Sequence, residues 1–95
     1  ENANAGEDQE LCSPVSIAIM NGNNAIQPAI GTWSLGSHPG NPEIVEPNNP
    51  LTAVNNFAIG ITELIWTIDN GPCGTTTDTV RVVVYDPLSP SAAVD

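Results

Sequence analysis

Proline sets the strongest limit on what this chain can fold into. Nine prolines and eight glycines are spread along its 95 residues, and the longest proline-free segment is 51–71. Proline ends helices because it lacks an N–H group and its ring clashes with the preceding turn. Good helix formers are also scarce, whereas Val, Ile and Thr together number 25. Short β-branched runs between turn residues favour an all-β fold.

Several of these runs alternate apolar and polar residues, which is the pattern of a strand with one buried face. In 63–69, for example, the apolar residues fall on every second position, with Ile65 as the one exception. We expect about seven strands, at 3–6, 15–20, 31–35, 43–46, 51–55, 63–69 and 76–85. This number and spacing are typical of an immunoglobulin-like antiparallel β-sandwich.

The alternation also predicts the core of the domain. Both tryptophans lie on the apolar face of their strands, which favours a buried pair over an exposed platform for stacking sugars. In 15–20, Val15, Ile17 and Ile19 share one face, and we expect that face to point inward. The predicted core residues are Ile17, Ile19, Trp33, Leu64, Trp66, Ile68, Val80, Val82 and Val84.

Composition divides the chain and excludes several functions. After Asp86 the residues become Pro, Ser and Ala, so we expect a domain at 1–86 and a linker at 87–95. No apolar run approaches the ~18 residues of a membrane helix. The net charge is -10, with a single basic residue. Such a surface repels phosphate backbones and anionic lipids, which argues against nucleic-acid binding and membrane docking.

The two cysteines, Cys12 and Cys73, match no zinc or redox spacing. We predict a disulfide between them, with two buried thiols as the alternative. In the chain-entropy model a loop of this length would stabilise the fold by about 4 kcal/mol. A bridge would indicate an oxidising, extracytoplasmic setting. In a standard immunoglobulin topology the two positions lie at opposite ends, so Cys12 must lie on an early segment that reaches the Cys73 end, or the topology is not standard. No signal peptide is visible, so we expect a piece of a longer secreted chain.

Several segments together resemble a known family of repeats. They are 3–9 (ANAGEDQ), 11–12 (LC), 31–34 (GTWS), 49–54 (NPLTAV), 66–73 (WTIDNGPC) and 78–80 (DTV). In this order they are similar to the PKD-like, immunoglobulin-like repeats of very large secreted proteins of Bacteroidetes, which are associated with gliding motility and type IX secretion. The chain departs from that pattern at Glu7, where the family usually has Pro, and in the Pro-rich loop 37–43. The resemblance implies surface architecture and adhesion, and it brings no catalytic motif.

Few residues could support catalysis or metal binding. His38 lies in a Gly-Ser-His-Pro-Gly loop without the elbow and orienting acid of a catalytic triad, so we interpret it as an exposed loop histidine. Paired carboxylates for glycoside hydrolysis would need a cleft that a sandwich of this size hardly offers. Glu7, Asp8 and Asp86 lie near the two chain ends and are the candidate calcium ligands, although no Asp-x-Asp-x-Asp-Gly spacing is present. A solvated acidic surface is the simpler interpretation of these three residues.

The sequence therefore predicts a non-catalytic, extracellular, immunoglobulin-like module without a cofactor. Its expected partners are neighbouring repeats of the same chain, in a cell-surface stalk or adhesin. Two alternatives remain open. One is a module whose loops at one end bind a surface glycan or protein. The other is an accessory domain of a secreted hydrolase.

Overall fold

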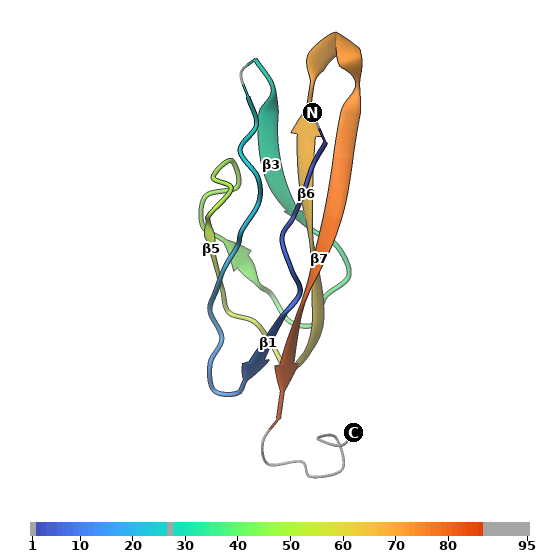
Figure 1. The fold of residues 1–95 in the computed structure, drawn as a ribbon. Coiled ribbons are helices and arrows are strands. Elements are labelled where there is room, and N and C mark those ends of the chain that lie inside the picture. Colours follow the sequence, from blue (N-terminus) through green and yellow to red (C-terminus); the bar gives the residue numbers. More distant parts are fainter. Residues whose placement is uncertain (1, 27, 87–95) are drawn as a thin grey trace.

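The protein is described from a computed structural model, which places residues 2–26 and 28–86 (Figure 1). Two sheets pack face to face. The four-stranded sheet has the order β1-β7-β6-β3, and the three-stranded sheet has the order β2-β5-β4. The strands are β1 (Gln9–Cys12), β2 (Ala18–Ile19), β3 (Ile30–Leu35), β4 (Glu43–Ile44), β5 (Ala53–Asn55), β6 (Gly60–Asp69) and β7 (Thr75–Tyr85). The predicted all-β sandwich of seven strands is confirmed.

The domain is long and narrow, with extents of 50 × 23 × 17 Å. Its axis is the β6–β7 hairpin, whose strands pair antiparallel from Gly60↔Val84 to Asp69↔Thr75. The 3-10 turn η1 (Gly71–Cys73) joins them at one tip of the molecule. Gly71 and Gly74 have φ angles of +65° and +94°, which side-chain-bearing residues rarely adopt, so glycine at these positions lets the chain close the hairpin between the two predicted strands.

The core lies between the two sheets and is centred on the two tryptophans. The ring centroids of Trp33 and Trp66 are 5.0 Å apart with the planes tilted by 37°, and both side chains are buried. Seven of the nine predicted core residues are confirmed, namely Trp33, Leu64, Trp66, Ile68, Val80, Val82 and Val84. The remaining buried apolar residues are Ala5, Ala18, Met20, Val54 and Phe57.

The prediction for Ile17 and Ile19 is wrong. They are 54% and 58% exposed, whereas Ala18 and Met20 are buried. Residues 15–20 do alternate between two faces, but the face with Ala18 and Met20 points inward. An alternating pattern shows that a strand has two different faces and does not show which of them is buried. The next inward residue is Gly22, where a Cβ would lie 3.0 Å from the Trp33 ring. Two indoles already fill this part of the interior, so small or flexible side chains fit there and isoleucine does not.

The N-terminal segment also differs from the prediction. Residues 3–6 form no strand, and β1 begins at Gln9, outside the predicted strands. Side chains hold the early segment on β7 instead, since the Ala3 N–H donates to Thr76 Oγ1 (2.9 Å) and the Ala5 N–H donates to Asp78 Oδ2 (2.7 Å). A backbone ladder forms only from Gln9 onward, where β1 runs parallel to β7. This pair is the one parallel pairing among the described strands, and the other four are antiparallel.

The parallel β1–β7 pair gives the molecule two distinct ends. At the N-terminal pole, Ala3 lies beside Thr76 and the η1 turn projects beyond it. At the C-terminal pole, Cys12 pairs with Tyr85, the last residue of β7. The two poles are an 11-residue strand apart, or about 33 Å at the usual rise per residue. The predicted linker 87–95 lies outside the described residues.

Candidate functional site

The predicted cysteine pair is the clearest disagreement between the sequence and the structure. Cys12 ends β1 at the C-terminal pole, and Cys73 lies in η1 beyond the other end of β7. A disulfide requires Cα atoms within about 7 Å. The predicted intrachain bridge is therefore wrong. The alternative of two buried thiols is wrong as well, because both cysteines are free and exposed.

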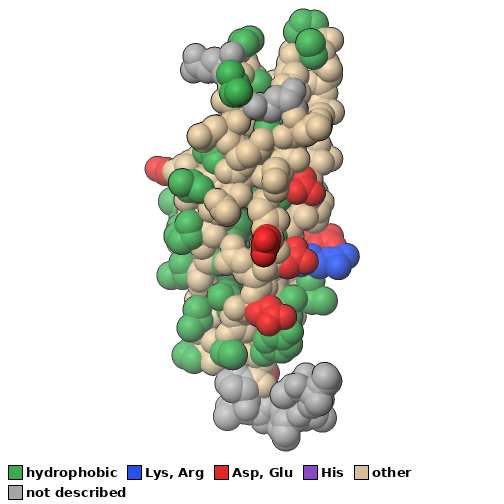
Figure 2. All heavy atoms as spheres, viewed as in Figure 1, with side chains coloured by type: hydrophobic (Ala, Val, Ile, Leu, Met, Phe, Trp, Pro, Cys, Tyr) green, Lys and Arg blue, Asp and Glu red, His purple; other side chains and the backbone are tan. Residues whose placement is uncertain are grey.

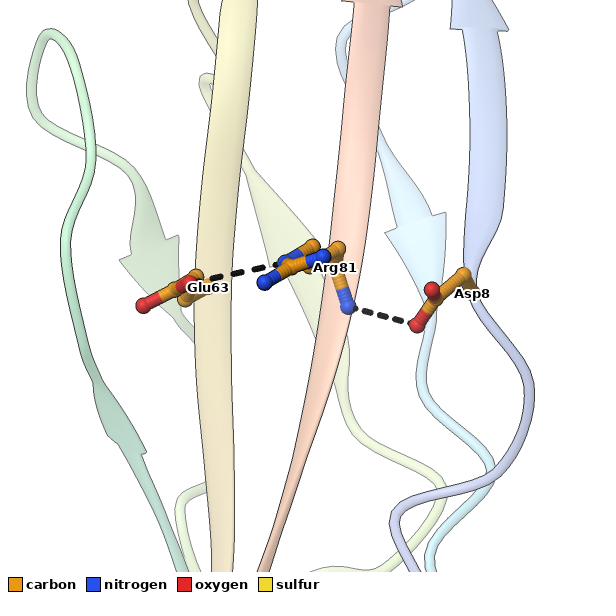
Figure 3. Close-up of polar contacts among 3 residues, drawn as sticks. All are labelled: Asp8, Glu63 and Arg81. Carbon is orange, nitrogen blue, oxygen red and sulfur yellow. Dashed lines mark hydrogen bonds and ion pairs between the residues drawn. The ribbon is translucent and has the colours of Figure 1, made fainter.

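The candidate calcium ligands do not converge. Asp8 Oδ1 accepts the backbone N–H of Arg81 at 3.0 Å, and the Arg81 Nε lies 3.5 Å from Glu63 Oε2 (Figure 3). Asp86 follows the end of β7, five residues beyond Arg81, which corresponds to about 17 Å along the strand. Within residues 2–26 and 28–86 no three His, Cys, Asp or Glu side chains are grouped as a metal site would require.

Glu7 borders a polar pocket of about 430 Å³ near the N-terminal segment. The lining residues are Asn4, Gly6, Glu7, Asn21, Gly22 and Asn23. Glu7 is the one carboxylate in this lining, whereas calcium takes six to eight oxygen ligands. The amide of Asn23 already bonds the early segment, because its Oδ1 accepts the Asn4 N–H at 2.8 Å and its Nδ2 donates to Asn2 O at 2.9 Å. The polar side chain of Asn23 in this pocket therefore has a structural role, because it holds the N-terminal segment in place.

His38 is exposed in the loop after β3. Its Nδ1 lies 3.1 Å from Gly40 O and 3.4 Å from Pro39 O. These partners are backbone carbonyls, and no serine hydroxyl or carboxylate of the described residues bonds this ring. The arrangement provides no activated nucleophile of the Ser–His type.

A second pocket, of about 250 Å³, lies toward the N-terminal pole. Its lining residues are Asn24, Ala25, Ala29, Ile30, Gly31, Asn48, Pro50 and Trp66. Trp66 is fully buried, so it forms part of the floor and offers no exposed ring for sugar stacking. Asn48 Nδ2 is committed to Gly31 O (2.8 Å) and Thr32 Oγ1 (3.0 Å). This pocket could not be predicted from the sequence, because it forms only where loops from distant parts of the chain meet.

On the face seen in Figure 2, most acidic side chains and most apolar side chains gather in different places. Figure 2 shows acidic side chains around the single blue cation, Arg81, which lies between Asp8 and Glu63. Apolar side chains lie along the side that carries the three-stranded sheet. Within the described part of the chain, no helix has the length and apolar character needed to cross a bilayer.

These features define an immunoglobulin-like β-sandwich with free, exposed cysteines at its two ends and no convergent site among the described residues. Comparison with solved structures defines the fold more narrowly. The chain is similar to a PKD domain from the KIAA 1837 protein, with a TM-score of 0.78, 23% identity, and coverage of 97% of this chain and 93% of that one. It is also similar to a PKD domain of human KIAA0319, with a TM-score of 0.74, 17% identity, and coverage of 90% and 80%. No protein-family model and no curated protein sequence matches the chain. The fold is therefore that of a PKD domain.

Proposed function

We propose that this domain is a non-catalytic extracellular module, one repeat of a tandem cell-surface stalk or adhesin. The observation that carries the proposal is the position of the two poles. Ala3 and Tyr85 lie at opposite ends of a domain 50 Å long and only 23 Å wide. A chain that passes lengthwise through each module can join many modules end to end, and each adds the distance of about 33 Å between its poles to the stalk.

The charge of the domain supports the same function. The chain carries 11 acidic residues and one basic residue. Neighbouring copies of such a domain repel one another along their sides, which favours an extended array over a collapsed one. Secretion, an assignment to Bacteroidetes and an adhesive role rest on the resemblance of the sequence motifs to type IX secreted repeats.

The test is the sequence of the parent gene beyond Asp95. A tandem array requires a second copy there, beginning close to Ala-Gly-x-Asp-Gln and followed by a cysteine within about ten positions. A catalytic domain at that place would contradict the stalk and support the accessory-domain alternative. Purified domain should also turn over no substrate in a broad hydrolase screen, and activity that disappears in His38→Ala would contradict the non-catalytic assignment.

The second candidate function is binding of a glycan or protein by loops near one end. The pocket lined by Asn24 and Asn48 favours it, because the Asn24 amide in an open depression can hydrogen-bond hydroxyl groups. A glycan array followed by calorimetry tests it. Binding with a Kd below ~1 mM that Asn24→Ala abolishes and Ser37→Ala leaves intact would support this function. Binding that both variants leave unchanged would exclude the pocket as its site.

A further inference from the structure

An exposed thiol lies at each pole of the domain. Cys12 is the last residue of β1 and pairs with Tyr85, where the described chain leaves the sandwich. Cys73 is the last residue of η1 and lies at the opposite tip, beyond the point where Ala3 joins β7. In a head-to-tail array the C-terminal pole of one module faces the N-terminal pole of the next. The two thiols therefore lie on the surfaces that meet.

We propose that Cys12 of one module and Cys73 of the following module form a disulfide across each junction of the array. This inference rests on the tandem arrangement proposed above. An interface repeated head to tail joins different surfaces of successive copies. Only a bond between Cys12 and Cys73 can recur at every junction of such an array. A bond between two Cys12 or two Cys73 residues would require modules in opposite orientations.

The local structure leaves both thiols room to approach a partner. Cys73 lies in a three-residue turn next to Gly74, and a Cβ added at Gly71 or Gly74 would meet no atom within 4 Å. Cys12 ends an edge strand that pairs on one side only, with β7. Neither cysteine is buried, so a Cα separation of about 4.4–6.8 Å between modules needs no unfolding of either one.

The bond would also have a mechanical role. Two neighbouring modules each carry a net charge of -10, so their contact is electrostatically unfavourable. A covalent bond holds the junction together despite this repulsion. It would keep adjacent modules in one relative orientation even at low ionic strength, where repulsion is least screened.

The reaction is an ordinary thiol–disulfide exchange. One thiolate attacks oxidised glutathione and releases one reduced glutathione, which leaves a mixed disulfide on the protein. The second cysteine thiolate then attacks the protein sulfur of that mixed disulfide, the S–S bond between modules forms, and a second reduced glutathione leaves. The two cysteines lose two electrons and two protons in total, and the glutathione disulfide is reduced.

The test uses two complete copies of the chain fused head to tail. One variant keeps Cys12 of the first copy and Cys73 of the second, with Ser at the other two cysteine positions. The matched control keeps Cys73 of the first copy and Cys12 of the second, which lie at the far ends of the fused molecule. Both cysteines are exposed, so serine at these positions should change stability little and both proteins should fold.

After equilibration with oxidised glutathione, thiols are counted with Ellman's reagent and by mass spectrometry. We expect the first variant to lose both thiols as a monomer without bound glutathione, and the control to form no such internal bond. Two free or glutathione-capped thiols in the first variant, or equal bridging in both, would overturn the inference. Neither result depends on the parent gene. A tandem parent with an unbridged fused protein would refute the disulfide alone, whereas a parent without a second copy would refute the stalk.

Discussion

Gly31→Ala places one methyl group against the buried Trp66 ring. A Cβ at residue 31 would lie 2.3 Å from Cη2 and from Cζ2 of Trp66. Carbon atoms in favourable contact are about 3.5–4.0 Å apart, so the overlap exceeds 1 Å. The Trp66 ring cannot easily move away, because it packs against Trp33 and its Nε1 donates to Asn23 Oδ1 at 2.9 Å. Either the ring or strand β3 must shift.

The expected cost follows from two opposing effects. Overpacking a close-packed core costs about 1–3 kcal/mol, whereas Gly→Ala restricts the unfolded chain and returns about 0.4–1 kcal/mol at a compatible position. An overlap above 1 Å belongs to the upper half of the overpacking range, about 2–3 kcal/mol, so we expect Gly31→Ala to lower the free energy of unfolding by about 1–2.5 kcal/mol. A domain of this length has only about 5–14 kcal/mol in total. The melting temperature should fall by about 4–8 °C for each kcal/mol.

Urea unfolding followed by tryptophan fluorescence measures this cost, and a double-mutant cycle assigns it to the ring. Phenylalanine lacks the part of the indole that a Cβ at residue 31 would strike, so Gly31→Ala should cost at least ~1 kcal/mol less in a Trp66→Phe background. Ser34→Ala, at an exposed position of the same strand, serves as the control and should be nearly neutral. An equal cost of Gly31→Ala in both backgrounds would refute the packing argument.

Three further substitutions test other parts of the structure by the same urea titration. Asp78→Ala removes the acceptor of the Ala5 N–H and should cost about 1–2 kcal/mol, with faster hydrogen exchange at the Ala5 amide; unchanged exchange would contradict the contact. Met20→Ala should cost about 2–5 kcal/mol and Ile19→Ala less than about 0.5, and the reverse order would restore the original prediction for this face. Thr62→Val should be neutral or stabilise by up to about 1 kcal/mol, because Thr62 Oγ1 is buried without a partner among the described residues; a large loss would indicate a hidden hydrogen bond.

The long strands could be predicted from the sequence because their pattern and their packing agree. In β6 the buried residues fall on every second position from Thr62 to Ile68, and in β7 from Val80 to Val84. Each strand is long enough for the alternation to fix both its period and its apolar face. Strand β2 has two residues, flanked by apolar side chains on both faces. Its period was visible, but its inward face depends on the space beside Trp33 and Trp66, which local sequence does not report.

The two pockets were harder to predict than the strands, because they depend on contacts between distant parts of the chain. The Asn23 side chain receives the Trp66 Nε1–H and the Asn4 N–H from segments 43 and 19 residues away. An Asn-rich loop gives no indication of such partners. The prediction of a disulfide between Cys12 and Cys73 was wrong for a related reason. Two cysteines in a small domain suggest a pair, but the distance between them is determined by the order and direction of the strands.

The parallel pairing of β1 with β7 explains why the predicted disulfide is wrong, and it also underlies the proposed function. Because β1 runs parallel to β7, Ala3 lies beside the start of β7 and Cys12 lies beside its end. An antiparallel pair would have brought Cys12 toward Thr75 and the η1 turn, within reach of Cys73, and would have placed both ends of the domain at one pole. The parallel pair separates the thiols by the length of β7 and sends the chain lengthwise through the sandwich. A geometry that forbids the bond within one module thus places its two cysteines at the two ends that would meet in the proposed array.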